Sequence, residues 1–147
     1  SRHILNISKY CVDIGAVLSV KIFKKITFSS KSKLRIIDDF AFYDSTIESI
    51  SIPLNVTHIG KNAFANCSQL KKISFLSNSN LQIIDEYAFY FSPIESISLP
   101  FSVTQIGLFL LRYCSELKII EVNSFIDINQ FQSMNEIILM IPIENNS

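Results

Sequence analysis

Two pairs of adjacent acidic residues, Asp38-Asp39 and Asp85-Glu86, are best suited to acid–base chemistry in this sequence. Two carboxylates flanking a sugar linkage are the machinery of a glycosidase. Each pair, however, begins a short apolar segment that we expect to be helical, and negative charge is stabilised at the positive end of a helix. That structural role is a sufficient explanation, so we do not expect these acids to be catalytic.

Histidine and cysteine provide no metal-binding pattern. The histidines are His3 and His58, and neither belongs to a Cys/His cluster with the ligand spacing of a zinc site. The sequence also contains no recognisable nucleophile–base pair or phosphate-binding loop. It therefore predicts a protein that is not an enzyme and holds no cofactor or metal. His58 takes the place of Gln105 in a matching repeat, which predicts an exposed polar side chain.

The cysteines are better explained by packing than by redox chemistry. Cys67 and Cys114 occupy the same position in two segments that are 47 residues apart. If these segments stack two units apart, about 10 Å separates the two thiols, whereas a disulfide needs Cα atoms within about 7 Å. We predict that both are buried free thiols that pack like small apolar side chains. Cys11 has no equivalent.

The elements that position these residues come from an internal repeat. Residues 34–56, LRIIDDFAFYDSTIESISIPLNV, align without a gap with residues 81–103, LQIIDEYAFYFSPIESISLPFSV, at an offset of 47 residues. Residues 56–75 align with residues 103–122 at the same offset. Both pairs share one half-period pattern, so the repeating unit has 22–25 residues.

Two apolar patterns define the unit. The first is I-x-x-x-A-F, in three copies beginning at Ile37, Ile59 and Ile84 with a degenerate fourth at Ile106, and it predicts a short helical turn. The second is an alternating strand pattern with these copies: Phe23-Ile26-Phe28, Ile47-Ile50-Ile52, Leu70-Ile73-Phe75, Ile94-Ile97-Leu99, Leu117-Ile120-Val122 and Met134-Ile137-Leu139.

No unit of this kind can cover its own apolar face, so neighbouring units must stack. We expect an α/β solenoid of about six units with a parallel sheet and short helical turns, in which Phe42, Phe64 and Phe89 form an internal column. The segment IPLNVTHIGKNAFANCSQL, residues 52–70, resembles the BspA-type leucine-rich repeats of bacterial and protist surface proteins. Over residues 23–122, the resemblance implies a curved leucine-rich-repeat stack with a surface-exposed interaction or adhesion role.

We treat residues 1–147 as one leucine-rich-repeat domain. Residues 1–22 are an irregular N-terminal unit or cap, residues 23–122 are regular repeats, and residues 123–147 are a shortened C-terminal repeat or cap. If the caps leave the ends uncovered, we expect end-to-end self-association through the terminal strands. Hydrophobic residues make up 48% and charged residues 18%, which argues against disorder.

Outward positions of the predicted strands form columns across the sheet. The first column is Lys24, Glu48, Lys71, Glu95, Lys118 and Asn135, in which the sign of the charge alternates. We favour a self-neutralising ladder here, because a patch that binds a charged partner would keep one sign. The alternative is an interaction surface, and its candidate residues are Lys24, Glu48, Lys71, Lys72, Glu95, Lys118, Ile119 and Glu121. Exposed Ile119 and Ile138 mark either a contact or a site covered by the tail.

The leading functional hypothesis is a non-enzymatic protein-interaction module, a fragment of a cell-surface or secreted adhesin that binds a host or matrix protein. The alternative is a structural spacer or an intracellular, cytoplasmic scaffold without a ligand of its own. The 13 basic and 13 acidic residues balance, which argues against nucleic acid as a partner. No apolar run is long enough for membrane insertion. Four N-glycosylation motifs, at Asn6, Asn55, Asn66 and Asn145, matter if the chain is secreted by a eukaryote.

Overall fold

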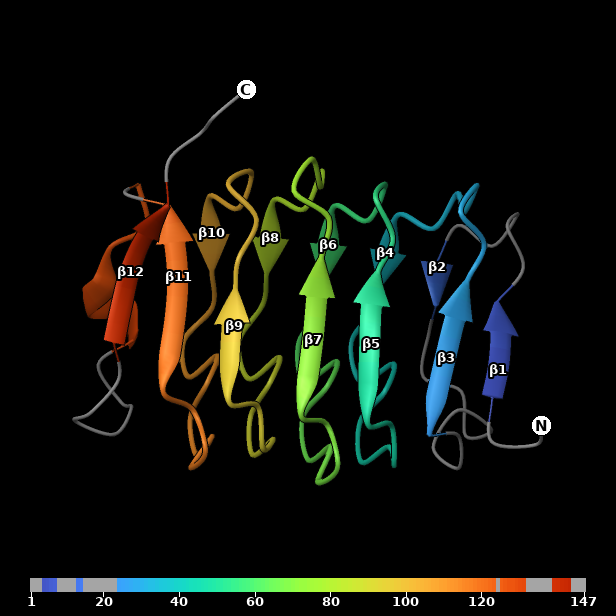
Figure 1. Cartoon of the computed structure of the whole chain (residues 1–147), viewed down its shortest axis with the longest axis horizontal. Coiled ribbons are helices and arrows are strands. Elements are labelled where there is room, and N and C mark those ends of the chain that lie inside the picture. Colours follow the sequence, from blue (N-terminus) through green and yellow to red (C-terminus); the bar gives the residue numbers. More distant parts are fainter. Residues whose placement is uncertain (1–3, 8–12, 15–23, 124, 132–138, 144–147) are drawn as a thin grey trace.

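The chain coils into a solenoid whose successive coils stack side by side (Figure 1). The computed structural model describes residues 4–7, 13–14, 24–123, 125–131 and 139–143. The front face of Figure 1 holds the longer strands β1 (Ile4–Ile7), β3 (Lys25–Phe28), β5 (Ser49–Ile52), β7 (Lys72–Phe75), β9 (Ser96–Ser98), β11 (Ile119–Asn123) and β12 (Leu139–Ile143). The rear sheet holds β2 (Asp13–Ile14), β4 (Ile36–Ile37), β6 (His58–Ile59), β8 (Ile83–Ile84) and β10 (Gln105–Ile106).

β3, β5, β7, β9 and β11 form where the alternating pattern predicts strands. Ile50 lies opposite Ile73 in a parallel pair, and both side chains are buried. The residues that follow them, Ser51 and Ser74, point outward, and their hydroxyl oxygens are 2.9 Å apart. Because successive side chains of a strand alternate between its faces, the repeat offset determines which residues share the outer face. The predicted parallel sheet and its columns are therefore confirmed between β5 and β7.

The rear sheet was not predicted. Ile37, Ile59 and Ile84, which we expected to begin helical turns, lie instead in β4, β6 and β8. These two-residue strands pair in parallel through the register Ile37↔Ile59↔Ile84. The solenoid thus has sheets on two sides, and Ile37, Ile59, Ile84 and Ile106 of the rear strands are buried.

The predicted helical turns are also wrong, because the segments after the rear strands are successive tight turns. The N–H groups of Phe40 and Phe42 donate to the carbonyl oxygens of Lys61 and Ala63 in the next coil, at 2.9 and 2.7 Å. Ala41 instead bonds within its own turn, to the Asp38 carbonyl oxygen at 3.2 Å. In an α-helix each N–H group bonds to the carbonyl oxygen four residues earlier in the same helix. A helix here would therefore leave no N–H group for the hydrogen bonds between coils.

The core is a column of aromatic rings, as the sequence predicts. Phe64 stacks on Phe42 with ring centroids 5.0 Å apart, and on Phe89 at 5.7 Å. All three rings are fully buried. Each of these three coils therefore contributes one ring, and the stacked rings join neighbouring coils.

The front sheet loosens at two places. β3 and β5 share only the register Lys25↔Ser49, and β7 and β9 belong to separate hydrogen-bonded sheets. By contrast, β5–β7 and β9–β11 pair over several residues. The loosened junctions are those where the front strands repeat after 24 residues, from Ile26 to Ile50 and from Ile73 to Ile97, whereas the well-paired ones repeat after 23. The looseness therefore recurs with the 47-residue double unit.

The C-terminal register differs from the prediction. We aligned Leu139 with Val122, but β12 places Leu139 opposite Ile119 and Pro142 opposite Val122. The strand is thus displaced by three residues, and Met134 and Ile137 lie outside the described residues. The cause is the weak pattern here, since the adjacent apolar residues 137–141 fit more than one alternation.

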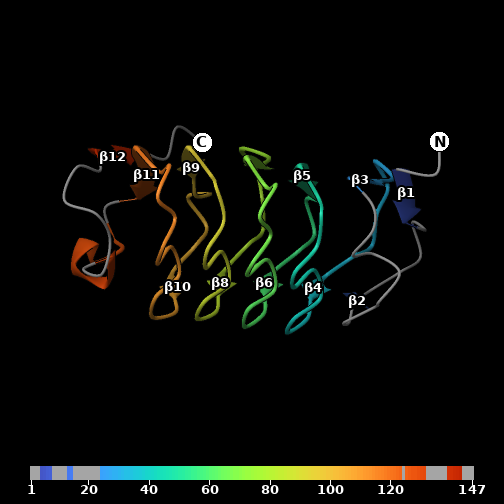
Figure 2. The same cartoon turned by 90° about the horizontal axis from the view of Figure 1, so that it is seen from below.

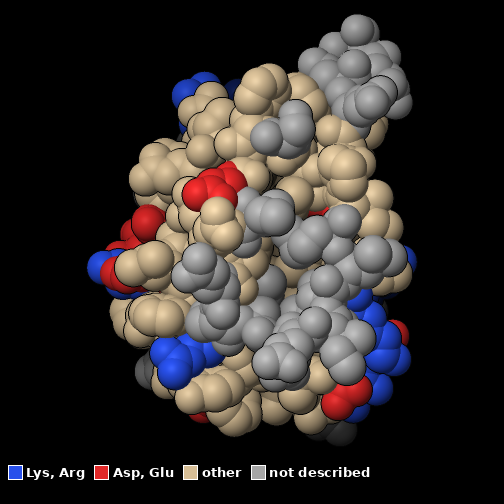
Figure 3. All heavy atoms as spheres, turned by 90° about the vertical axis from the view of Figure 1, so that its left-hand side faces the viewer, with Lys and Arg blue, Asp and Glu red and all other residues tan. Residues whose placement is uncertain are grey.

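The C-terminal end of the core is closed by the segment before β12. Ile126 and Phe131, the latter at the end of the 3₁₀ helix η2 (Ile128–Phe131), are buried against the core. Figure 3 views this end, where most described atoms are uncharged. Pro142 in the terminal strand lacks an N–H, which weakens this strand as an edge for further pairing. End-to-end association through the terminal strands stays a prediction.

Candidate interaction surface

All eight candidate residues lie along the outer surface of the front strands, which we call the strand face. Two of them, Ile119 and Glu121 of β11, are half-buried. The other six are exposed: Lys24, Glu48, Lys71, Lys72, Glu95 and Lys118. Ile119 lies between Ser96 of β9 and Leu139 of β12. The tail therefore flanks Ile119 without fully covering it, and Ile138 lies outside the described residues.

The charge ladder forms at one step of the four that were predicted. Lys24 Nζ lies 3.8 Å from Glu48 Oε1, and both side chains are more than half exposed. Among the residues that the structure describes, no ion pair joins Glu48 to Lys71, Lys71 to Glu95 or Glu95 to Lys118. Their backbones are nevertheless adjacent, since the Lys118 N–H donates to the Glu95 carbonyl at 2.9 Å. Beyond Lys24 and Glu48, the described charged side chains of this column therefore do not neutralise one another by direct contact.

A hollow of about 470 Å³ lies over the loosened junction between β7 and β9. Its charged lining comes from both strands and from β11, namely Lys71, Lys72, Glu95 and Glu121. Between these charges lie the hydroxyl groups of Ser74, Ser96 and Ser98 and the edge of Phe75. This surface offers both signs of charge, hydroxyl groups and some apolar area, which suits contact with a folded protein.

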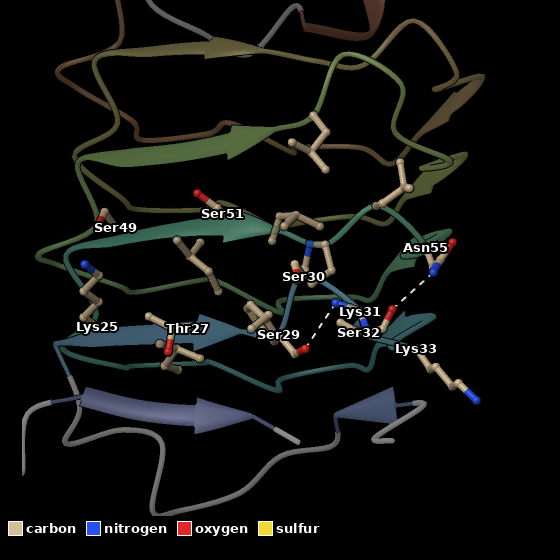
Figure 4. A pocket seen from close by; sticks show the side chains of 17 residues that line it. Lys25, Thr27, Ser29, Ser30, Lys31, Ser32, Lys33, Ser49, Ser51 and Asn55 are labelled. Atoms are coloured by element: carbon tan, nitrogen blue, oxygen red, sulfur yellow. Dashed lines mark hydrogen bonds between the residues drawn. The ribbon is translucent and has the colours of Figure 1, made fainter. Parts of the chain in front are cut away.

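A second hollow, of about 660 Å³, lies over the other loosened junction, between β3 and β5 (Figure 4). Lys25 and Ser51 project from the strands, and the Ser-rich loop 29–33 forms one wall. The Asn55 amide nitrogen donates to the Ser32 carbonyl oxygen at 3.1 Å and ties that loop to the next coil. The strand face is therefore hollowed twice, once in each 47-residue double unit.

Acids of both pairs bond to residues of neighbouring coils. Asp39 Oδ1 accepts the Lys61 N–H of the next coil at 2.7 Å. Lys61 Nζ donates to Glu86 Oε1 at 2.8 Å, and this hydrogen bond raises the pKa of the lysine. We attributed the acids to helix ends, which is wrong because no helix follows them. Among the described residues, no group of three or more His, Cys, Asp or Glu side chains is placed to hold a metal ion.

His58 has a specific partner that the sequence did not reveal. Its Nε2 lies 2.8 Å from Asp85 Oδ2 in the next coil, and both side chains are about one-third exposed. The sequence predicted an exposed side chain, and His58 is instead partly buried. Its contact is a link between β6 and the segment after β8.

Cys67 and Cys114 are buried free thiols, as predicted. Their Sγ atoms donate to equivalent carbonyl oxygens, of Phe42 at 3.0 Å and of Phe89 at 3.1 Å. Burial raises the pKa of the Cys67 thiol from 9.0 to about 12, and it raises the pKa of Cys114 as well. Both therefore stay protonated in the folded protein at neutral pH.

We expect the stability of the fold to decline above pH 9, because the unfolded thiols ionise there while the folded thiols keep their protons. This contribution is complete below the unfolded pKa of 9.0 and is lost as the pH rises towards the folded pKa of about 12. Urea unfolding at about pH 8 and about pH 10 measures it. A Cys67→Ala, Cys114→Ala variant should show a flatter decline, and equal slopes in the two proteins would contradict the assignment to the thiols.

A second surface was missed by the sequence analysis. Tyr87, Tyr90, Phe91, Phe109 and Tyr113 are packed ring against ring on the tight turns, with centroids 5.4–5.8 Å apart. The Arg112 guanidinium carbon lies 4.9 Å from the Phe109 ring centroid and 5.0 Å from that of Tyr113. The signal was present in the sequence as aromatic residues on both sides of the repeated apolar pair, but we considered only the internal column of Phe42, Phe64 and Phe89.

Comparison with known proteins agrees with this architecture. The model of the BspA type leucine rich repeat region matches in six copies, over residues 5–118 and 35–146. The pneumococcal vaccine antigen PcpA is 36% identical with a TM-score of 0.67, over 70% of this chain and 26% of its own. This chain thus spans about a quarter of PcpA. No curated protein matches the sequence.

Two further solved structures share the fold. A leucine-rich-repeat protein from Bacteroides capillosus is 25% identical with a TM-score of 0.54, over 80% of this chain and 78% of its own. A leucine-rich cell surface protein from Faecalibacterium prausnitzii is 20% identical with a TM-score of 0.60, over 81% and 38%. No helix among the described residues is long and apolar enough to span a membrane. The family match covers most of the sequence, and the chain belongs to the BspA-type leucine-rich-repeat family.

Proposed function

We propose that this chain is a non-enzymatic protein-binding module of a cell-surface adhesin and that the strand face is its binding surface. The observation that carries the proposal is the failure of the charge ladder to close. Lys71, Lys72, Glu95 and Lys118 are exposed and form no ion pair with any described residue. A ladder that only stabilised the sheet would bring these charges into contact, so their free ends favour a partner.

The relatives support a surface location. PcpA is a vaccine antigen, and the Faecalibacterium prausnitzii relative is described as a cell surface protein. Because this chain corresponds to about a quarter of PcpA, we propose it as one part of a longer adhesin. Within it, we propose one repeat domain over residues 1–147, with residues 1–22 as an irregular unit or cap and residues 123–147 as a shortened repeat or cap. A host or matrix protein is the partner class we propose.

The test is a binding screen with a matched pair of charge variants. The folded chain and a Lys71→Glu, Lys118→Glu variant are compared on immobilised matrix and serum proteins at several salt concentrations. We expect the variant to lose at least about tenfold in affinity, since reversing contact charges in an interface changes binding by more than 1.4 kcal/mol. The control is Arg35→Glu, Gln82→Glu, Gln105→Glu, which makes the same change in net charge at exposed residues away from the strand face.

The outcomes separate the two functional hypotheses. Binding lost in the strand-face variant and kept in the control supports the adhesin. Equal binding by all three proteins would move the binding site away from the strand face. If no protein binds and circular dichroism shows each to be folded, the structural spacer is the better hypothesis.

A further inference from the structure

The exposed turns form a continuous edge of the solenoid, which we call the turn edge. Four equivalent turns, residues 38–45, 60–67, 85–92 and 107–114, stand in a row beneath the rear sheet, on the side away from the front strands (Figure 2). Each turn presents three residues at equivalent positions: Phe40, Tyr43 and Asp44; Asn62, Ala65 and Asn66; Tyr87, Tyr90 and Phe91; Phe109, Arg112 and Tyr113. The row is small and polar in the second turn and bulky in the third.

The aromatic residues of this edge are unfavourable for the local backbone. Phe91 and Tyr113 have φ of 61°, in the left-handed region where bulky side chains are strained. The second turn makes the same backbone with Asn62 and Asn66, at φ of 56°, and asparagine tolerates this conformation well. Folding therefore does not require aromatic residues here. Phe91 and Tyr113 also remain 56% and 54% exposed, so the core does not use them either.

We propose that the turn edge binds a second copy of this chain in antiparallel orientation, around a two-fold axis between the second and third turns. In this arrangement the first turn of one copy meets the fourth turn of the other, and the second turn meets the third. A two-fold interface repeats every contact twice. The first turn must therefore be complementary to the fourth, and the second to the third. The charges of the outer turns and the side-chain sizes of the inner turns satisfy this condition.

The charges are complementary between the outer turns. Asp44 is exposed, and no described residue forms an ion pair with its carboxylate. In the antiparallel pair we place it opposite Arg112 of the other copy, the residue just before Tyr113, which holds the position of Asp44 in the fourth turn. Arg112 already lies over the rings of Phe109 and Tyr113, which hold the guanidinium in place and remove part of the ordering cost of the contact. A carboxylate is the natural partner for that fixed planar donor.

The sizes are complementary between the inner turns. Ala65 is fully buried and leaves the surface low between Asn62 and Asn66. Tyr90 holds the same position in the third turn, where it packs against Tyr87 and Tyr113 with centroids 5.4 and 5.5 Å apart. The raised aromatic turn of one copy therefore fits the low turn of the other. The third and fourth turns carry tyrosine, phenylalanine and arginine and no lysine, a composition that is typical of interface centres.

This pairing leaves both strand faces open, because the turn edge projects on the opposite side of the solenoid (Figure 2). The inference does not depend on the proposed function. If the strand face binds a partner, however, the pair presents two binding surfaces and gains avidity from their linkage.

The test uses reversal of the predicted contact. Arg112→Asp and Asp44→Arg each place like charges at both copies of the contact, so each variant alone should be monomeric in sedimentation velocity at concentrations where the unchanged chain is a dimer. An equimolar mixture of the two restores an Asp–Arg pair at both contacts and should form a heterodimer. The double variant, Asp44→Arg with Arg112→Asp, should dimerise again for the same reason. Arg35→Asp is the matched control and should behave like the unchanged chain.

Several outcomes would overturn the inference. It fails if the unchanged chain stays monomeric at millimolar concentration, if the dimer is indifferent to both single variants, or if the mixture does not recover. Phe91→Asn guards against misfolding of the charge variants, because Asn66 already occupies the equivalent position. We expect this variant to fold and to weaken the dimer about tenfold or more, as for a buried aromatic at an interface centre. An unchanged dimer affinity in folded Phe91→Asn would count against the turn edge.

Discussion

Replacing Phe64 with alanine should lower the free energy of unfolding by about 4 kcal/mol, the usual cost of removing a buried phenylalanine ring. Phe64 is fully buried and stacks on both Phe42 and Phe89, at 5.0 and 5.7 Å. In a solenoid each coil contacts only its neighbours, so this one ring contributes to two coil–coil contacts. Urea unfolding followed by circular dichroism measures the loss, and the midpoint temperature should fall by about 12 °C.

Two control variants test whether the loss comes from the stacked ring. Phe64→Leu should lose about 1.5 kcal/mol, because Leu111 fills the equivalent position of the fourth turn and is buried there. Phe125→Ala makes the same deletion at a side chain that is 79% exposed, and should change stability by less than about 0.5 kcal/mol. If Phe64→Ala were no more costly than Phe125→Ala, the ring column would not be the centre of the core.

Gly60→Ala should destabilise the fold by about 3 kcal/mol, because the added methyl group meets backbone atoms that cannot move aside. A Cβ at residue 60 would lie 2.5 Å from Asp39 N and 2.7 Å from Asp38 C. The Gly60 N–H also donates to the Ile37 carbonyl at 2.7 Å, and pushing the coils apart would break that bond. Gly107 makes the same approach to Asp85 and Glu86 in the double unit that follows.

The sign of this effect is informative. Gly60 does not have a positive φ, and alanine at a permissive glycine usually stabilises by about 0.4–1 kcal/mol through the unfolded state. Asp38→Ala is the matched control, since residue 38 holds the equivalent place in the preceding coil and already carries a Cβ; it should cost less than about 1 kcal/mol. Thermal unfolding of the two variants compares them directly. A stabilised Gly60→Ala would show that the coils tolerate a wider spacing.

The repeat pattern alone was enough to predict the stack, the front strands and the buried column of phenylalanines. Ile50 and Ile73 face inward and Ser51 and Ser74 face outward because side chains alternate along a strand. The positions of Cys67 and Cys114 followed from the same offset. Such conclusions depend on local alternation and on the period of the repeat, and both can be counted along the chain. Where the repeat weakens, after residue 123, the predicted register was wrong by three residues.

The sequence also determined which residues line the strand face, but it did not determine how they interact. Lys24 and Glu48 form the predicted pair, whereas the charges near β7 and β9 lie apart around a hollow where the sheet loosens. The alternation of sign was visible in the sequence. The distance between side chains was not, because it depends on how closely each pair of coils approaches.

Only the tertiary structure decided the rear sheet, the tight turns and the turn edge. The N–H of Phe42 bonds to Ala63 in the next coil, and Gly60 allows the backbones to approach. These contacts join residues more than 20 positions apart, and they take the place of the local hydrogen bonds of a helix. The spacing of apolar residues at positions i, i+4 and i+5 cannot reveal such contacts. The same turns hold Phe91 and Tyr113 in left-handed backbone at the surface. The repeat determined that the coils stack, and hydrogen bonding between the coils determined the shape of each coil.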